Sequence, residues 1–164
     1  MSKVVLKLGD DVSTDIIYPG RFMATVLPTE TPQYVFADLV DFNTRVKNKA
    51  IQPQSVIVAG RNFGCGSSRE QAASCLKGPD FIVIARDFAR IFLQNSINLG
   101  LNTIICPSIE ADEGDELKIS ATHVVNQRSG KSFELVPLPQ ARQAIIDAGG
   151  LIPYTRQRLL QTKK

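Results

Sequence analysis

Short apolar runs alternate with stretches of helical character through the middle of the chain. Runs rich in Val and Ile that are too short for a helix are typical of strands buried on both faces. Asp87 is a suitable N-cap for one helix, and Gly78 and Gly100 are suitable residues to end the two helices. This alternation predicts right-handed βαβ units and a parallel sheet. The predicted strands and helices are residues 56–59, 71–77, 81–85, 88–99 and 102–106.

The N-terminal part is less regular. Residues 4–8 predict a first strand that ends at Gly9, and residues 10–15 are polar and acidic, as is typical of a turn. Residues 21–33 contain two prolines and lack periodicity, which predicts a loop whose length points to a functional or mobile segment. Residues 34–40 favour a short helix.

The C-terminal third has a different pattern, with short β-like segments at residues 116–120, 122–126 and 131–136. They predict a small antiparallel or barrel-like section packed beside the parallel one. A helix is expected at residues 140–148, followed by a tail past Pro153 that is either helical or frayed. The expected fold class is therefore α/β, with a parallel βαβ section and a small antiparallel section in one domain, residues 1–164.

The composition narrows the class of protein. With 43% apolar and 21% charged residues, the chain has the composition of an ordinary soluble globular domain. Its net charge of +3 is weak and scattered, which argues against a nucleic-acid-binding stripe, and no apolar run reaches membrane-spanning length. Cys65, Cys75 and Cys106 are widely spaced, so we expect a reducing cytoplasmic location and neither a disulfide framework nor a metal centre.

A glycine-rich turn links the predicted strand at 56–59 to the helix at 71–77, and it reads Gly64-Cys65-Gly66-Ser67-Ser68-Arg69-Glu70. Such a turn directs free backbone N–H groups and the positive end of a helix dipole towards a ligand. Arg69 adds a bidentate cation, which together with the turn indicates a carboxylate-binding site beside a serine. Ser67 with Glu70 also fits a capping box, so the pattern leaves plain helix capping equally open.

Other residues with chemical potential have simpler interpretations. His123 is the only histidine and stands in a strand-like segment, so a structural role is favoured over a catalytic one. Cys65 lies next to a helix N-terminus, where a cysteine can be reactive, but a small buried residue between two glycines is the better interpretation. Asp10, Asp11 and Asp15 match no calcium-loop spacing.

Three motifs together resemble the swivelling domain of the aconitase superfamily. The segment 62–72, with Gly-Ser-Ser-Arg-Glu at its centre, is similar to that family's central motif. Residues 87–92, with Asn95, Asn98 and Gly100, resemble the segment that follows it. Residues 9–15 with Pro19-Gly20 resemble the N-terminal motif, and the length is similar to that of the separate small subunits of isopropylmalate dehydratases and homoaconitases.

This resemblance implies a fold, a partner and a reaction. The fold would be the three-layer β/β/α swivelling domain, and the partner a large subunit that carries a [4Fe–4S] cluster, so that this chain would hold no cofactor. The reaction would be dehydration and rehydration of a hydroxy dicarboxylic acid. Ser67 would remove the C–H proton as an alkoxide stabilised by its surroundings. Gly66, Ser68 and Arg69 would bind substrate carboxylate, supported by Thr14, Asp15 and Cys65.

The loop after Pro19-Gly20 bears on the substrate. By resemblance, this loop touches the variable group of the substrate, and some isopropylmalate enzymes have arginine where Ala24 stands. The loop residues are apolar or small, which favours an alkyl group over a third carboxylate. Isopropylmalate is therefore preferred to homocitrate, with a methyl-substituted malate as a third option. The expected substrate-contacting residues of the loop are Phe22, Met23, Ala24 and Thr25.

Two alternatives come from other functional classes. The first is a non-catalytic or regulatory domain that binds carboxylates through the same turn. The second is a nucleic-acid-binding domain, which the absence of a basic stripe disfavours. The presence of Ser67, Ser68 and Arg69 together favours the catalytic subunit over both.

Overall fold

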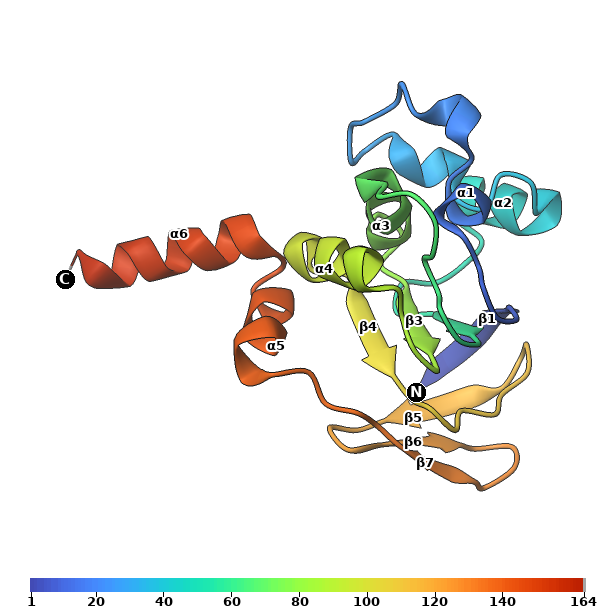
Figure 1. Cartoon of the computed structure of the whole chain (residues 1–164). Helices are drawn as coiled ribbons and strands as arrows, with labels where there is room; N and C mark the ends of the chain where they lie inside the picture. The colour runs from blue at the N-terminus through green and yellow to red at the C-terminus, as the bar shows by residue number, and fades with distance from the viewer. Residues whose placement is uncertain (164) are drawn as a thin grey trace.

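The structure is a computed structural model that describes residues 1–163, and its sheet begins with four parallel strands (Figure 1). β2 pairs with β1 and β3, and β3 pairs with β4, all in parallel. Every residue of β2 and β3 is buried, which explains their unbroken apolar sequences. The parallel sheet predicted from these runs is confirmed. The strands are β1 (Ser2–Lys7), β2 (Val56–Ala59), β3 (Ile82–Ala85) and β4 (Asn102–Ile105).

Three antiparallel strands continue the same sheet. They are β5 (Glu116–Ile119), β6 (His123–Asn126) and β7 (Ser132–Glu134). β5 pairs with β1, so the order across the seven strands is β4-β3-β2-β1-β5-β6-β7. An isolated bridge between Ile105 and Val136 brings the two ends of this order together. The predicted barrel-like section is thus one half of a curled sheet and not a separate body beside the parallel half.

Helices cover the outer face of the parallel half, with α3 and α4 above it in Figure 1 and the antiparallel strands below it. This arrangement is the expected β/β/α order of layers. No helix within residues 1–163 is long and apolar enough to cross a membrane. The helices are α1 (Thr14–Ile17), η1 (Gly20–Phe22), η2 (Thr31–Tyr34), α2 (Val40–Lys47), α3 (Glu70–Lys77), α4 (Arg90–Leu99), α5 (Gln140–Asp147) and α6 (Leu151–Thr162).

The parallel strands separate two apolar cores. Ile57 and Val83 pack under the helices, in a core that includes Phe92. Val58 and Ile84 point the other way, into a core shared with the antiparallel strands. Because alternate residues of one strand enter different cores, both faces of β2 and β3 must be apolar.

Two element predictions at the ends of helices differ from the structure, and two agree with it. The helix expected at residues 34–40 is wrong, because Phe36 has a φ of 45° and the helix begins only at Val40. Asp87 does not cap α4: Ala89 is the N-cap residue, and the Asp87 carboxylate accepts a hydrogen bond from the Asn62 N–H at 2.6 Å. Gly100 ends α4 as expected, with a φ of 75°. The tail past Pro153 is helical.

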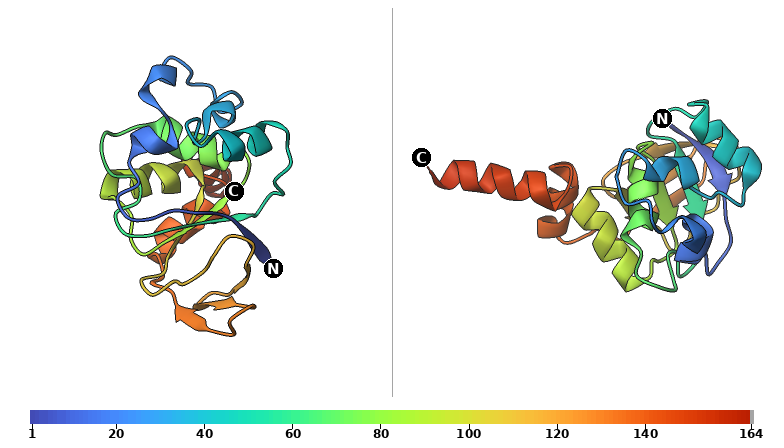
Figure 2. Two further views of the ribbon diagram at one scale, coloured as in Figure 1. Left: turned by 90° about the vertical axis from the view of Figure 1, so that its right-hand side faces the viewer. Right: turned by 90° about the horizontal axis from the view of Figure 1, so that it is seen from above.

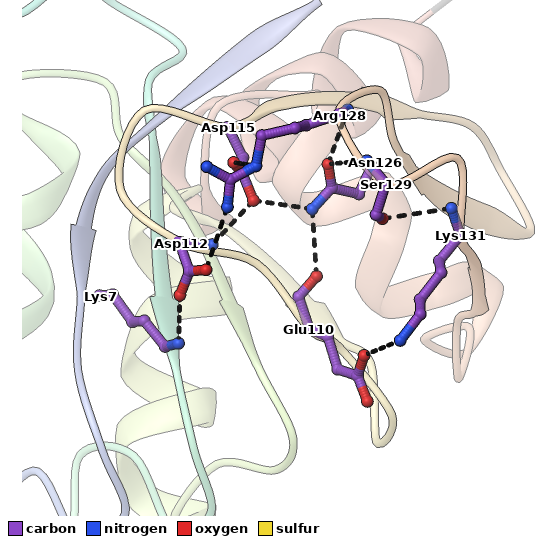
Figure 3. A network of polar contacts seen from close by, with 8 residues as sticks. All are labelled: Lys7, Glu110, Asp112, Asp115, Asn126, Arg128, Ser129 and Lys131. Atoms are coloured by element: carbon purple, nitrogen blue, oxygen red, sulfur yellow. Dashed lines mark hydrogen bonds and ion pairs between the residues drawn. The ribbon is translucent and has the colours of Figure 1, made fainter.

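A buried carboxylate holds the turn between β4 and β5 to the β6–β7 turn (Figure 3). Asp115 Oδ2 accepts hydrogen bonds from the Asp112 N–H at 2.9 Å and the Asn126 amide at 2.8 Å. The Arg128 Nε lies 2.8 Å from Oδ1, an ion-pair contact outside hydrogen-bond geometry. The Asp112 N–H and the Asn126 amide hold the pKa of Asp115 below its ordinary value, so this carboxylate is charged at neutral pH.

We expect Asp115→Ala to lower the free energy of unfolding by about 2–3 kcal/mol, since it removes the acceptor of the Asp112 N–H and of one N–H of the buried Asn126 amide, whose other contact is the Glu110 carbonyl. Asp112→Ala is the matched control, because Asp112 is an exposed partner of Lys7 and Arg128 and such surface pairs contribute under about 1 kcal/mol. Urea unfolding of both variants measures the difference. Equal losses of unfolding free energy in the two variants would show that the burial of Asp115 does not increase its contribution to stability.

Candidate active site

The three motifs singled out in the sequence meet beyond the carboxyl ends of β1, β2 and β3. The Gly64 N–H donates to the Val12 carbonyl at 2.8 Å, and the Thr14 N–H donates to the Cys65 carbonyl at 2.8 Å. On the other side, the Ala89 N–H donates to the Phe63 carbonyl at 2.9 Å. The glycine-rich turn is therefore held between the two other motifs like the middle strand of a small extension of the sheet.

The acidic residues of the first motif hold this turn in place. Asp10 Oδ1 accepts from the Arg61 N–H at 2.7 Å, and Asp11 Oδ1 accepts from the Asn62 amide at 2.8 Å. These contacts explain the acidic sequence better than a cation site does. Within residues 1–163, no group of three His, Cys, Asp or Glu side chains is placed to hold a metal ion.

Two glycines in the turn are required by its geometry. Gly64 has a φ of 82°, and a Cβ there would lie 2.2 Å from the Phe92 ring of α4. Gly66 has a φ of 93°, next to the Thr14 hydroxyl. That hydroxyl donates to the Ser67 carbonyl at 2.9 Å, which fixes the backbone at the serine. Thr14 therefore contacts the turn directly at Ser67.

The structure tests the helix-capping interpretation of the two serines. Arg69 is the N-cap residue of α3, and no side chain forms a capping hydrogen bond there. Ser67 and Ser68 lie one turn before the helix and are exposed. The capping box, one of the two open interpretations, is therefore not formed. Both hydroxyls remain accessible to a ligand beside the N-terminus of an eight-residue helix.

Arg69 is oriented by two acceptors on the first motif. Its Nη1 donates to Asp15 Oδ1 at 2.6 Å and to the Tyr18 carbonyl at 3.0 Å. The Gly20 N–H also donates to Asp15 Oδ1, at 2.9 Å. The Arg69 side chain is 18% exposed and the Asp15 side chain 66% exposed, so the cation is largely enclosed while its counter-ion faces solvent. The other nitrogens of a guanidinium held in this way can bind a carboxylate.

Asp15 is charged at every ordinary assay pH. The hydrogen bond from Arg69, and after it that from the Gly20 N–H, hold the pKa of Asp15 below its ordinary value of 3.8. A depressed carboxyl pKa means that the contact persists above pH 3.8 and is lost only as the pH falls through the lower folded value. The Asp15 contact to Arg69 therefore does not titrate between about pH 5 and 8.

We expect Asp15→Asn to lower kcat/KM about tenfold, because Arg69 loses an ionic partner that orients it. Since wild-type Asp15 does not titrate in this range, the ratio of variant to wild type should stay constant from about pH 5 to 8. Steady-state kinetics of the chain combined with the large subunit that the resemblance implies measures the ratio over this range. A ratio that approaches one towards pH 5 would mean that Asp15 becomes protonated there.

The predicted substrate loop, Phe22 to Thr25, is fastened next to Arg69. The Phe22 ring stacks on Tyr34 with ring centroids 4.2 Å apart. The Tyr18 hydroxyl lies 3.1 Å from the Phe22 carbonyl and 3.2 Å from the Thr25 carbonyl, within reach of a shared hydrogen bond. Met23 and Ala24 are exposed at the tip, so their side chains are free to meet a ligand.

Three residues that hold this region were not identified from the sequence, and His123 lies outside it. Tyr18 and Tyr34 hold the loop, and Gln71 reaches the Met23 carbonyl at 3.4 Å. No spacing rule identifies them, since Tyr34 and Gln71 fall in predicted helices and no element was predicted at Tyr18. His123 lies on β6, in the antiparallel half, and its Nδ1 is 2.9 Å from the Thr122 hydroxyl oxygen, within hydrogen-bond distance. Cys65 is half-buried inside the turn.

Comparison with known proteins gives a consistent result. A family model described as the aconitase C-terminal domain matches residues 11–108. The 3-isopropylmalate dehydratase small subunit of Methanosarcina mazei is 43% identical over 156 residues, which covers 92% of this chain and 93% of the relative. The isopropylmalate/citramalate isomerase small subunit of Methanocaldococcus jannaschii is 40% identical over 165 residues, covering 97% and 95%.

A solved structure is also similar. The crystal structure of a 3-isopropylmalate dehydratase protein from Methanocaldococcus jannaschii superposes with a TM-score of 0.87 at 38% sequence identity. The match covers 98% of this chain and 96% of that one, so it includes the curled sheet and the helices around it.

Proposed function

Since the chain belongs to the aconitase C-terminal domain family, we propose that it is the small subunit of a 3-isopropylmalate dehydratase. Such an enzyme is a hydro-lyase that interconverts 2- and 3-isopropylmalate by dehydration and rehydration, in leucine biosynthesis. The observation that carries the proposal for the site is the pairing of a held guanidinium, Arg69, with two exposed serines that do not cap a helix. The unpaired cysteines favour a cytoplasmic location.

Arg69 and Ser68 bind a substrate carboxylate in this proposal. Asp15 and the Tyr18 carbonyl occupy one nitrogen of the guanidinium, which leaves the other N–H groups to face a carboxylate. The backbone N–H groups around Gly66 and the dipole of α3 favour the same negative charge. Together they fix the position of the substrate carbon that loses a proton.

Ser67 acts as the base. Its alkoxide takes the proton from the carbon beside the carboxylate, and the electron pair of that C–H bond forms the double bond as hydroxide leaves the neighbouring carbon. Rehydration reverses these steps, with the proton returned from the Ser67 hydroxyl. A serine alkoxide needs nearby donors and cations, which the turn and Arg69 supply.

The departing hydroxyl requires a Lewis acid, and residues 1–163 offer no group of three His, Cys, Asp or Glu side chains placed to hold a metal ion. In the proposal, a [4Fe–4S] cluster on the large subunit supplies Lewis acidity at that hydroxyl. Cys75 and Cys106 are buried, and the thiol of each donates a hydrogen bond to a backbone carbonyl. Cys65 lies in the glycine-rich turn. Burial raises the pKa of both the Cys75 and the Cys106 thiols, which disfavours the thiolate form that binds iron. The cysteines of this chain therefore do not fit a cluster.

We expect the isolated chain to bind less than about one tenth of an equivalent of iron after anaerobic reconstitution with iron and sulfide, because it offers no converging thiolates. Iron and acid-labile sulfide are measured after gel filtration, with the large subunit treated in parallel as the positive control. Stoichiometric iron and sulfide in this chain would contradict the two-subunit arrangement.

The loop favours an alkyl group on the substrate. Arg21 is the one cation of the loop, and it is turned away into an ion pair with Asp38 at 2.5 Å while lying over the Phe22 ring. A third carboxylate, as in homocitrate, would therefore find no free cation on this loop. The exposed Met23 and the small Ala24 leave room for an isopropyl or a methyl group.

A methyl-substituted malate is the second candidate substrate. It is favoured by the same loop and by the relative from Methanocaldococcus jannaschii, whose name includes citramalate. Homoaconitate remains the third candidate, and a domain that binds carboxylates without catalysis is the alternative from another class.

An anaerobic assay with the purified large subunit tests the proposal. The ultraviolet absorbance of the unsaturated intermediate is followed with isopropylmalate, citramalate and homocitrate offered separately. We expect turnover only when both chains are present and the highest kcat/KM with isopropylmalate. A complex that holds an intact cluster and turns over none of them would favour the non-catalytic alternative.

A further inference from the structure

The last helix, α6, contacts its own molecule only near its start. It leaves the body beside α4 and α5 and extends into solvent, away from α1 and the candidate site (Figures 1 and 2). None of its twelve residues is buried. Leu151, Ile152, Leu159 and Leu160 are 42%, 69%, 59% and 69% exposed. Since isolated helices of about this length are marginal in water, this projecting helix needs a partner surface that covers it.

Leu151 and Leu159 form a stripe along α6 with Thr155 between them, and an arginine lies on each side of it. Leu151, Thr155 and Leu159 recur every four residues, so they lie along one line of the helix. At 3.6 residues per turn, Arg158 falls on one side of this line and Arg156 on the other.

The charges on α6 specify the chemistry of the partner. From residue 148 to the end, the sequence contains four basic residues and no acidic one. Neither Arg156 nor Arg158 belongs to an ion pair within residues 1–163. An apolar groove with acidic residues on both rims would match the stripe and both arginines.

Two other occupants fit less well. A second copy of α6 would bring the same arginines together without any acid in either tail, which is unfavourable. A lipid surface takes up a broad and continuous apolar face. On α6, Thr155 interrupts the stripe and Arg156 stands between Ile152 and Leu160 on the helix surface.

We propose that α6 is a docking arm that lies in an acidic-rimmed apolar groove of the large subunit. The inference rests on the proposed function for the identity of the partner, and it adds the contact that holds the two chains together. Because the arm lies away from the candidate site, it contributes to the affinity between the chains and not to the chemical step. Its amide groups should accordingly be open to exchange in the free chain and protected in the complex.

Four variants of the full chain test the arm by titration into the cluster-bearing large subunit. Leu159→Asp replaces an apolar residue of the stripe with a charged one, and its control Gln157→Asp places the same residue on the opposite side of α6. Arg156→Glu reverses a flanking charge, and its control Arg142→Glu makes the same change on α5. Kd is measured by titration calorimetry, kcat at saturating small subunit, and amide protection of residues 151–162 by hydrogen exchange.

We expect both test variants to raise Kd at least tenfold with kcat unchanged at saturation, and both controls to stay within twofold of wild type. Residues 151–162 should gain protection when the large subunit binds. Unchanged Kd with normal turnover would overturn the arm and leave the proposed function standing, while a saturated complex with an intact cluster and no turnover would defeat the proposed function instead. Dimerisation of the free chain that Leu159→Asp abolishes, or binding of α6 to phosphatidylserine vesicles with no protection by the large subunit, would assign the helix to those occupants and overturn the proposal.

Discussion

Ser67→Ala should lower kcat of the two-subunit enzyme by about 10³- to 10⁴-fold, the range that loss of a positioned base produces. The substitution removes the only atom proposed to accept the substrate proton, while the backbone contact from the Thr14 hydroxyl to the Ser67 carbonyl stays in place. KM should change little because the carboxylate contacts are made by other residues. Steady-state kinetics with isopropylmalate measures both parameters, and exchange of the substrate C–H proton with deuterated solvent reports the proton transfer itself.

Two further serine variants show whether this effect belongs to position 67. Ser68→Ala should mainly raise KM, because Ser68 is proposed to bind carboxylate and not to move a proton. Ser132→Ala, an exposed serine on β7, should behave like wild type. Near-normal kcat in Ser67→Ala would assign the base to another group, and equal losses of kcat at positions 67 and 68 would mean that the turn as a whole had been disturbed.

The sheet could be predicted because its strands carry their own pattern. Ile57 and Val58 enter opposite cores, so the sequence of β2 has to be apolar at every position and stands out against the polar segments around it. The end of α4 at Gly100 could be predicted as well, because this position has a left-handed backbone conformation that glycine adopts readily. The residue pattern that predicts each of these elements lies within the element itself, so it can be recognised in the sequence.

Elements fixed by distant contacts could not be predicted in the same way. Tyr34, Val35 and Phe36 look like the start of a helix, but the Phe36 N–H donates to the Ile17 carbonyl at 2.8 Å, which draws the chain into a turn. The side chain of Asn43 then donates to the Val35 carbonyl from α2, at 2.8 Å. Tertiary hydrogen bonds here override helix propensity.

The same limit applies to the candidate site. The glycine spacing predicted the turn, and the motifs predicted which segments accompany it, but Ser-x-x-Glu is identical in a capping box and in this turn. The choice depends on Thr14 and Asp15, which lie more than 50 residues away and hold the Ser67 carbonyl and the Arg69 side chain. A single sequence does not show that residues so far apart along the chain are in contact.

Arg69→Lys should raise KM and lower kcat, for a combined loss of about 10²-fold in kcat/KM. The guanidinium can bind Asp15 and the Tyr18 carbonyl on one nitrogen and a substrate carboxylate on the others, and an ammonium group cannot do both in the same geometry. Arg21→Lys is the matched control, because Arg21 lies in η1, at the start of the predicted substrate loop, and pairs with Asp38. It should change kcat/KM by less than about threefold, as expected for an exposed ion pair.

A double variant separates orientation of Arg69 from its direct contact with substrate. If Asp15 acts only by orienting Arg69, then Asp15→Asn should cost little more once Arg69 is lysine, so the combined loss should be well below the product of the two single losses. A multiplicative loss would mean that Asp15 has a second role of its own, and wild-type kinetics in Arg69→Lys would remove Arg69 from the substrate site. Because Asp15 also accepts a hydrogen bond from the Gly20 N–H, just before the loop that is proposed to meet the alkyl group, coupling between these positions would also connect carboxylate binding to the placement of that loop.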